Sequence, residues 1–201
     1  MYIVVLDSLA ALAALAAIAA MSSRARSLRH DMRSNLDAAW REGTRIFISA
    51  IMESEQPWHA AFPAPKTAKP GSLSREEVLD KLRAGGAGRD FIIVDVRRND
   101  YEGGTVHGAI NLPAQSLYPT IPTLYQLFKN AGLEYVIWFC GSSQGRGTRA
   151  AAWFNDHIQE QGDKNMRSVI LTGGIKGWAN AGEEYVKFMD GYVPEYWTQF
   201  K

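Results

Sequence analysis

Short apolar runs alternate with amphipathic stretches through most of the chain beyond residue 70. Runs rich in β-branched and aromatic residues predict three buried strands, at 91–96, 133–139 and 168–171. Apolar residues at helical spacing predict helices around 78–82, 123–130 and 150–158. Strands and helices that alternate in this order predict an α/β fold: a parallel sheet with helices on both faces, in a single domain.

Local signals mark where this domain begins. Ser74 and Glu77 have the spacing of a capping box, which predicts that the first helix starts just after Ser74. Prolines in the segment 52–69 favour an extended, Pro-rich lead-in. We therefore expect a domain at 70–201. The aromatic residues near the end of the chain are expected to pack back on this domain.

The first 51 residues differ in character from the rest. Residues 2–20 form an apolar run, interrupted by Asp7, whose length approaches that of a membrane span. The segment that follows, to residue 51, has six arginines and no lysine. Three interpretations stay open: a membrane anchor, an organelle presequence, or an extension absent from most molecules if translation starts at Met52. The expected location is accordingly the cytoplasm or nucleus, with a mitochondrial or membrane-anchored protein as the alternative.

Composition narrows the function classes. The 201 residues have 46% hydrophobic content and a formal net charge of +1. This length and hydrophobic content are enough to fill one core. The small net charge argues against binding nucleic acid through bulk charge. Cys140 is the single cysteine, which excludes an internal disulfide and a cysteine-rich metal site. Any redox cycle at Cys140 needs an external thiol.

The chemistry is concentrated in the segment Cys140–Arg149. It lies between the predicted strand 133–139 and the helix that follows, so Cys140 stands where a buried strand passes through a loop to a helix N-terminus. Unpaired N–H groups and the helix dipole favour an anion at such a place, and the same field favours the thiolate of Cys140. Arg146 adds a planar fork able to hold two oxygens of a tetrahedral oxyanion.

We therefore predict Cys140 as the nucleophile and Arg146 as the main side chain on the oxyanion. The other residues of the loop are expected to bind the substrate; they are Gly141, Ser142, Ser143, Gln144, Gly145 and Gly147. Arg149 and Asp95 are auxiliary candidates, both with alternative structural roles. No metal ligand set is predicted.

Three segments together resemble a known family. Val94–Arg97 with His107–Pro113 is similar to the first signature of rhodanese-like domains, and Leu171–Trp178 to the second. The cysteine loop lies between them, with five residues from Cys140 to Arg146. That loop length resembles the branch of M-phase-inducer dual-specificity phosphatases and eukaryotic arsenate reductases, whereas sulfurtransferases of this fold have a loop one residue shorter.

The resemblance implies a cysteine-thiolate enzyme acting on a tetrahedral oxyanion, either an arsenate reductase or a phosphomonoester phosphatase. No cofactor is expected to be bound, and glutathione with glutaredoxin would be the external reductant for arsenate. Two departures bear on the choice: Phe139 replaces the usual histidine before the cysteine, and the loop has no acid. The missing acid argues against a phosphatase, because an alkoxide leaving group needs a proton donor. A sulfurtransferase and a non-catalytic binding module are the alternatives.

Overall fold

The computed structural model describes residues 40, 42–45 and 57–200. The N-terminal predictions for 1–51 lie almost entirely outside these residues. Residues 40 and 42–45 are helical, and the chain from Trp58 onward forms one compact unit. No helix in the described ranges combines the length and apolar character needed to cross a membrane.

The predicted parallel sheet is confirmed. Its five strands are β1 (Gly71–Leu73), β2 (Phe91–Asp95), β4 (Ile110–Asn111), β5 (Tyr135–Phe139) and β6 (Arg167–Leu171), in the spatial order β1-β6-β5-β2-β4. Every neighbouring pair is parallel. The central position of β5 between β6 and β2 places the residue after Phe139 at the carboxyl end of the sheet, where ligands of open α/β sheets bind.

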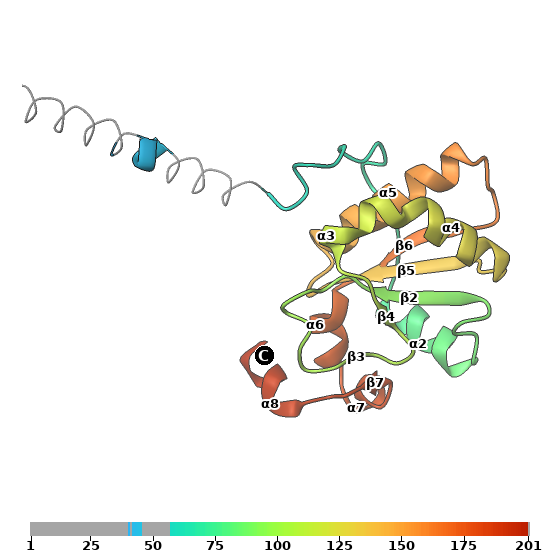
Figure 1. The fold of residues 1–201 in the computed structure, drawn as a ribbon. Helices are drawn as coiled ribbons and strands as arrows, with labels where there is room; N and C mark the ends of the chain where they lie inside the picture. The colour runs from blue at the N-terminus through green and yellow to red at the C-terminus, as the bar shows by residue number, and fades with distance from the viewer. Residues whose placement is uncertain (1–39, 41, 46–56, 201) are drawn as a thin grey trace, which may run out of the picture. The chain divides into compact units, whose positions relative to one another are not determined.

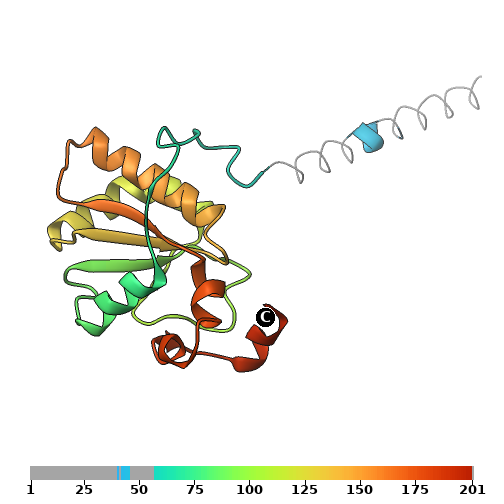
Figure 2. The same ribbon diagram turned by 180° about the vertical axis from the view of Figure 1, so that it is seen from behind.

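Helices cover both faces of the sheet, as predicted (Figure 1). One face carries α3 (Ala114–Leu117), the 3-10 turn η1 (Tyr118–Thr120), α4 (Ile121–Asn130) and α5 (Arg146–Glu160). The other carries α2 (Arg75–Arg83) and α6 (Gly174–Ala179), seen from behind in Figure 2. A hydrophobic core lies on each face of the sheet, because successive residues of a strand point to opposite faces. In β5, Trp138 packs with α5 on one face, and Ile137 and Phe139 pack with α2 and α6 on the other.

A small second sheet and several short helices close the fold. β3 (Thr105–Val106) pairs antiparallel with β7 (Met189–Asp190). The tail also forms α7 (Glu183–Val186), α8 (Pro194–Trp197) and the 3-10 turn η2 (Thr198–Phe200). Trp197 is buried, and its Nε1 donates to the carbonyl of Gly103 at 2.7 Å. The expectation that the aromatic tail packs on the domain is thus confirmed.

The part of the lead-in that belongs to the folded unit, 58–69, packs against α5. The backbone and hydroxyl of Thr67 both donate to Asp156, at 2.8 and 2.6 Å, and Trp153 Nε1 donates to the carbonyl of Pro63 at 2.8 Å. The rings of Trp58 and Phe62 each lie edge-on to Trp153. This part of the lead-in is therefore joined to the folded unit.

The capping box at α2 gives a prediction for stability. Ser74 Oγ accepts from Glu77 N–H at 3.2 Å, and the Glu77 carboxylate accepts from Ser74 N–H at 2.7 Å. Replacing Ser74 with Ala should lower the free energy of unfolding by about 1 kcal/mol, since one amide at the helix start loses its acceptor. Urea denaturation measures this. Ser72→Ala, on the exposed strand β1, is the control and should change stability by less than about 0.5 kcal/mol.

Candidate active site

The predicted strand–loop–helix setting of Cys140 is what the structure contains. Cys140 follows directly after β5, and α5 begins at Arg146. The cysteine is a free thiol, 4% exposed, packed in the core cluster that includes Val96 and Ala150. The five residues between Cys140 and Arg146 thus form a loop that joins the central strand to the longest described helix.

The backbone of this loop offers several hydrogen-bond donors. Within the described chain, no backbone N–H from Gly141 to Gly147 donates to a protein acceptor. The helix α5 also has no side-chain cap. Unsatisfied N–H groups at a helix start, together with the helix dipole, favour a bound anion. The unpaired donors of this loop are therefore suited to a bound anion.

Ser143 has a special place in the loop. It has a φ of +59°, which is unique among the non-glycine residues of the described ranges. It is 3% exposed, and its Oγ has no hydrogen-bond partner there. Thr148 Oγ1 donates to the Ser143 carbonyl at 2.5 Å and so helps to hold this backbone. A buried, unpaired hydroxyl in a left-handed residue is costly, which is typical of a functional loop.

The second signature segment fixes the start of the loop. The N–H groups of Ile175 and Lys176 donate to the carbonyls of Cys140 and Gly141, each at 3.0 Å. Gly174 has a φ of +57°, and a Cβ atom there would overlap both of these carbonyls. This close approach explains why glycine occupies position 174. The segment that resembles the second signature therefore acts as a clamp on the cysteine loop.

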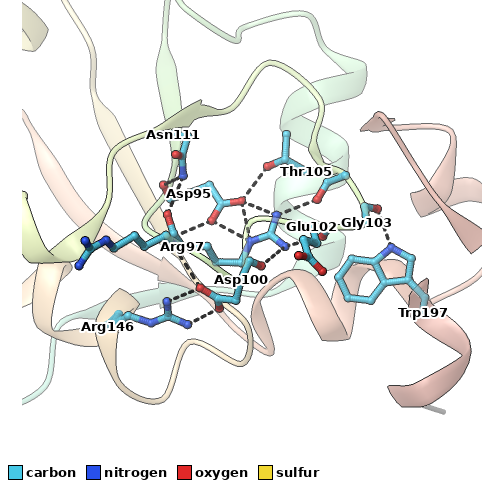
Figure 3. A network of polar contacts seen from close by, with 11 residues as sticks. Asp95, Arg97, Asp100, Glu102, Gly103, Thr105, Asn111, Arg146 and Trp197 are labelled. Atoms are coloured by element: carbon cyan, nitrogen blue, oxygen red, sulfur yellow. Dashed lines mark hydrogen bonds and ion pairs between the residues drawn. The ribbon is translucent and has the colours of Figure 1, made fainter. Parts of the chain in front are cut away.

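The first signature segment forms a buried polar network beside the loop (Figure 3). Arg97, 1% exposed, binds the carboxylate of Asp95, 0% exposed, through Nε and Nη2, the latter at 2.7 Å. Thr105 Oγ1 donates to the same carboxylate at 2.9 Å. Arg97 also donates to the carbonyls of Glu102 and Gly104, at 2.9 and 2.7 Å. Asp95 thus has the contacts of a residue that braces the loop 97–104.

Arg146 turns toward this network. Its Nη1 and Nη2 donate to Oδ1 and Oδ2 of Asp100, at 2.7 and 2.5 Å. The hydrogen bond from Arg146 is the main cause that lowers the pKa of Asp100 to about 2. The same hydrogen bond, with smaller contributions that include the electrostatic interaction with Cys140, raises the pKa of Arg146. At neutral pH both groups are charged, and the guanidinium lies within the electrostatic range of the thiol.

This ion pair predicts a pH-dependent contribution to stability. Because the folded pKa of Asp100 lies below its ordinary 3.8, the contribution is present above pH 4 and is lost as pH falls toward 2. The Asp100 side chain is 44% exposed, so solvent screening limits the contribution to about 1 kcal/mol. The Asp100→Asn variant should therefore be less stable than wild type at pH 7 by about that amount. The difference should shrink at pH 3; an equal difference at both pH values in urea denaturation would contradict the assignment.

The remaining candidates lie at different distances from this centre. Ser142, Gln144 and Gly145 are exposed at the loop surface, whereas Gly147 is buried, where an added Cβ would lie 3.3 Å from the backbone of Cys140. Arg149 stacks over the ring of Trp153, 5.7 Å from its centroid. That contact directs Arg149 to the lead-in face. In the described ranges, no group of three acidic, cysteine or histidine side chains is placed to hold a metal ion.

Comparison with known proteins agrees with this arrangement. The family described as the rhodanese-like domain matches residues 74–181, which is more than half of the chain. The chain belongs to the rhodanese-like family. The match includes both signature segments and the cysteine loop between them, so the family predicted from the sequence is confirmed.

Individual relatives of this rhodanese-like chain include proteins named for arsenical resistance and as a protein tyrosine phosphatase. Arsenical-resistance protein 2 of Saccharomyces cerevisiae is 31% identical over 97 residues, covering 45% of this chain and 75% of that protein. The structure of Ygr203w, a yeast protein tyrosine phosphatase of the rhodanese family, has a TM-score of 0.54 and 26% identity. It covers 63% of this chain and 96% of its own. A reductase for As and Sb from Leishmania major has a TM-score of 0.49 and 21% identity, covering 52% of this chain and 73% of its own.

Sequence reasoning missed Asp100 as a neighbour of the cysteine loop. The residue lies in the loop after β2, 46 positions before its partner Arg146. Its only local signal is its place between two segments of the first signature. An acidic residue within the first signature region, close to a motif that resembles a known family, was the signal that could have pointed to Asp100.

Proposed function

We propose that this rhodanese-like chain is a cysteine-dependent enzyme acting on a tetrahedral oxyanion, with arsenate as the preferred substrate. One observation carries the proposal: Cys140 stands at the carboxyl end of the central strand, in a loop whose amides from Gly141 to Gly147 have no protein acceptor among the described residues. Such a loop can bind three or four oxygens of one ion, and Arg146 at the start of α5 adds a cation beside it.

Arsenate reduction at this site would use the thiol of Cys140 and thiols supplied from outside the chain. The sulfur of Cys140 attacks arsenate and one arsenate oxygen leaves as water, so that a sulfur–arsenic(V) bond forms. A glutathione thiolate then attacks the Cys140 sulfur; the sulfur–arsenic electron pair stays on arsenic, which leaves as arsenite. A second glutathione, directly or through glutaredoxin, reduces the mixed disulfide and yields glutathione disulfide. The chain has one cysteine, so both electrons must come from outside it.

Phosphomonoester hydrolysis is the second candidate, supported by the likeness to the yeast tyrosine phosphatase. It needs a proton donor for the leaving oxygen. The loop itself has no acid, and the acid that contacts Arg146, Asp100, has a pKa near 2 and is ionised at neutral pH. Asp100 is thus a poor proton donor in the observed pairing. This difference favours arsenate over a phosphorylated protein.

Two assays on one preparation of the full chain separate the candidates. The first follows arsenate reduction coupled to glutathione, glutaredoxin and NADPH oxidation; the second follows hydrolysis of p-nitrophenyl phosphate. Each rate is corrected with the Cys140→Ser protein. Arsenate turnover with little phosphatase activity supports the reductase, and the reverse result supports the phosphatase. If neither substrate turns over, the proposal is wrong, and a persulfide on Cys140 after thiosulfate treatment would then identify a sulfurtransferase.

A further inference from the structure

The guanidinium of Arg146 is held from one end by a single carboxylate. Both terminal nitrogens donate to Asp100, one to each oxygen, in the two-pronged geometry of a strong ion pair (Figure 3). Asp100 belongs to the loop after β2, whereas Arg146 begins α5. The contact therefore joins the first signature segment to the cysteine loop.

Asp100 is itself fixed in place. The N–H of Arg98 donates to Oδ1 of Asp100 at 3.2 Å, and the carbonyl of Asp100 accepts from Arg97 Nη1 at 3.3 Å. Arg97 is anchored on the fully buried carboxylate of Asp95. A chain of contacts thus runs from the sheet core through Arg97 and Asp100 to Arg146. The carboxylate has a defined position and is not a freely moving surface acid.

The pairing leaves part of the guanidinium available. A guanidinium has five N–H donors, and the Asp100 pair uses one on each terminal nitrogen. The Nε–H and the outer hydrogens are not used by any described protein acceptor, and an oxyanion can bind along that edge. An arginine already fixed at one end loses less side-chain freedom when the oxyanion binds. The cost is that Asp100 cancels part of the positive charge near the loop.

We propose that Asp100 is a positioning residue: it holds Arg146 so that the free edge of the guanidinium receives the oxyanion at the Cys140 loop. The proposal rests on the proposed function, since it requires an oxyanion to bind there. It gives the polar network of the first signature a direct connection to the cysteine loop, through the contact of Asp100 with Arg146. It also gives Asp100 a role that does not require proton transfer.

The test measures anion affinity without turnover. Inorganic phosphate is titrated calorimetrically into the full chain with Cys140→Ser, with and without Asp100→Asn. Loss of the brace should weaken phosphate binding about five- to tenfold. Asp100→Glu should recover part of the affinity, because it keeps a carboxylate. Asp190→Asn is the matched control: it removes another half-exposed carboxylate, which pairs with His107, and should leave phosphate affinity unchanged.

A second background separates positioning from a general loss of structure. With Arg146→Ala also present, adding Asp100→Asn should no longer change phosphate affinity, because the residue it positions is gone. Circular dichroism and urea denaturation confirm that each variant is folded at the titration temperature.

The outcomes are distinct. If the parent protein with Cys140→Ser binds no phosphate, the proposed function fails. If the parent binds and Asp100→Asn binds equally well, the ion pair is incidental. Tighter binding by Asp100→Asn would show that the carboxylate competes with the oxyanion for Arg146. Either of the last two results overturns the positioning role while leaving the proposed function intact.

Discussion

Replacing Cys140 with Ser should reduce turnover of arsenate and of p-nitrophenyl phosphate by at least about a thousandfold, because a neutral hydroxyl is a far weaker nucleophile than a thiolate. The substitution changes one atom in a site that is 4% exposed. The loop amides and Arg146 stay in place, so phosphate should still bind. Initial rates, phosphate titration and urea denaturation of the two proteins test this.

The control for this prediction is Ser142→Ala. Ser142 lies in the same loop but is exposed, and its hydroxyl donates to no described residue. Its loss should change the rates only severalfold, as expected for one hydrogen bond to an oxyanion that the loop amides and Arg146 also bind. Folded Cys140→Ser protein that kept full turnover would show that another group performs the chemistry. Equal losses in both variants would instead indicate a disturbed loop.

The fold was predictable because its signals are local and repeated. The strands β2, β5 and β6 each contain a run of at least three apolar residues, and α5 has apolar residues at helical spacing over several turns. The cysteine loop was predictable for the same reason, since Cys140 and Arg146 lie at the two ends of one short segment between a strand and a helix. Arrangements that depend on neighbouring residues of the sequence can be inferred from the sequence.

Other features depend on contacts that the sequence pattern does not contain. The strands β3 and β7 are two residues long, too short for an alternating pattern, and they pair across more than 80 positions. The pair of Asp100 and Arg146 depends on the path of the loop 97–104, which is set by the bonds from Arg97 to loop carbonyls. The left-handed conformation of Ser143 is held by the hydrogen bond from Thr148 Oγ1 to its carbonyl. Such contacts follow from the assembled fold.

The buried pair of Asp95 and Arg97 gives the largest expected effect on stability. Replacing Asp95 with Asn removes the charge that compensates an arginine with 2% side-chain exposure. The free energy of unfolding should fall by about 3–5 kcal/mol, since the guanidinium cannot be solvated where it lies. Domains of this size have about 5–15 kcal/mol in total, so the variant should be close to its limit of stability at 37 °C. Urea denaturation at 15 °C measures the loss while the variant is still folded.

The matched control is Asp90→Asn, which breaks an ion pair of the same residue types, Asp90 with Arg89, at an exposed place. This variant should have an unfolding midpoint close to that of wild type. Because Arg97 also binds the carbonyls of Glu102 and Gly104, Asp95→Asn should release the loop that holds Asp100. Phosphate affinity should therefore fall with stability in Asp95→Asn, but not in Asp90→Asn. A loss of stability below about 1 kcal/mol would mean that water reaches Arg97, and that the buried pair does not brace the site.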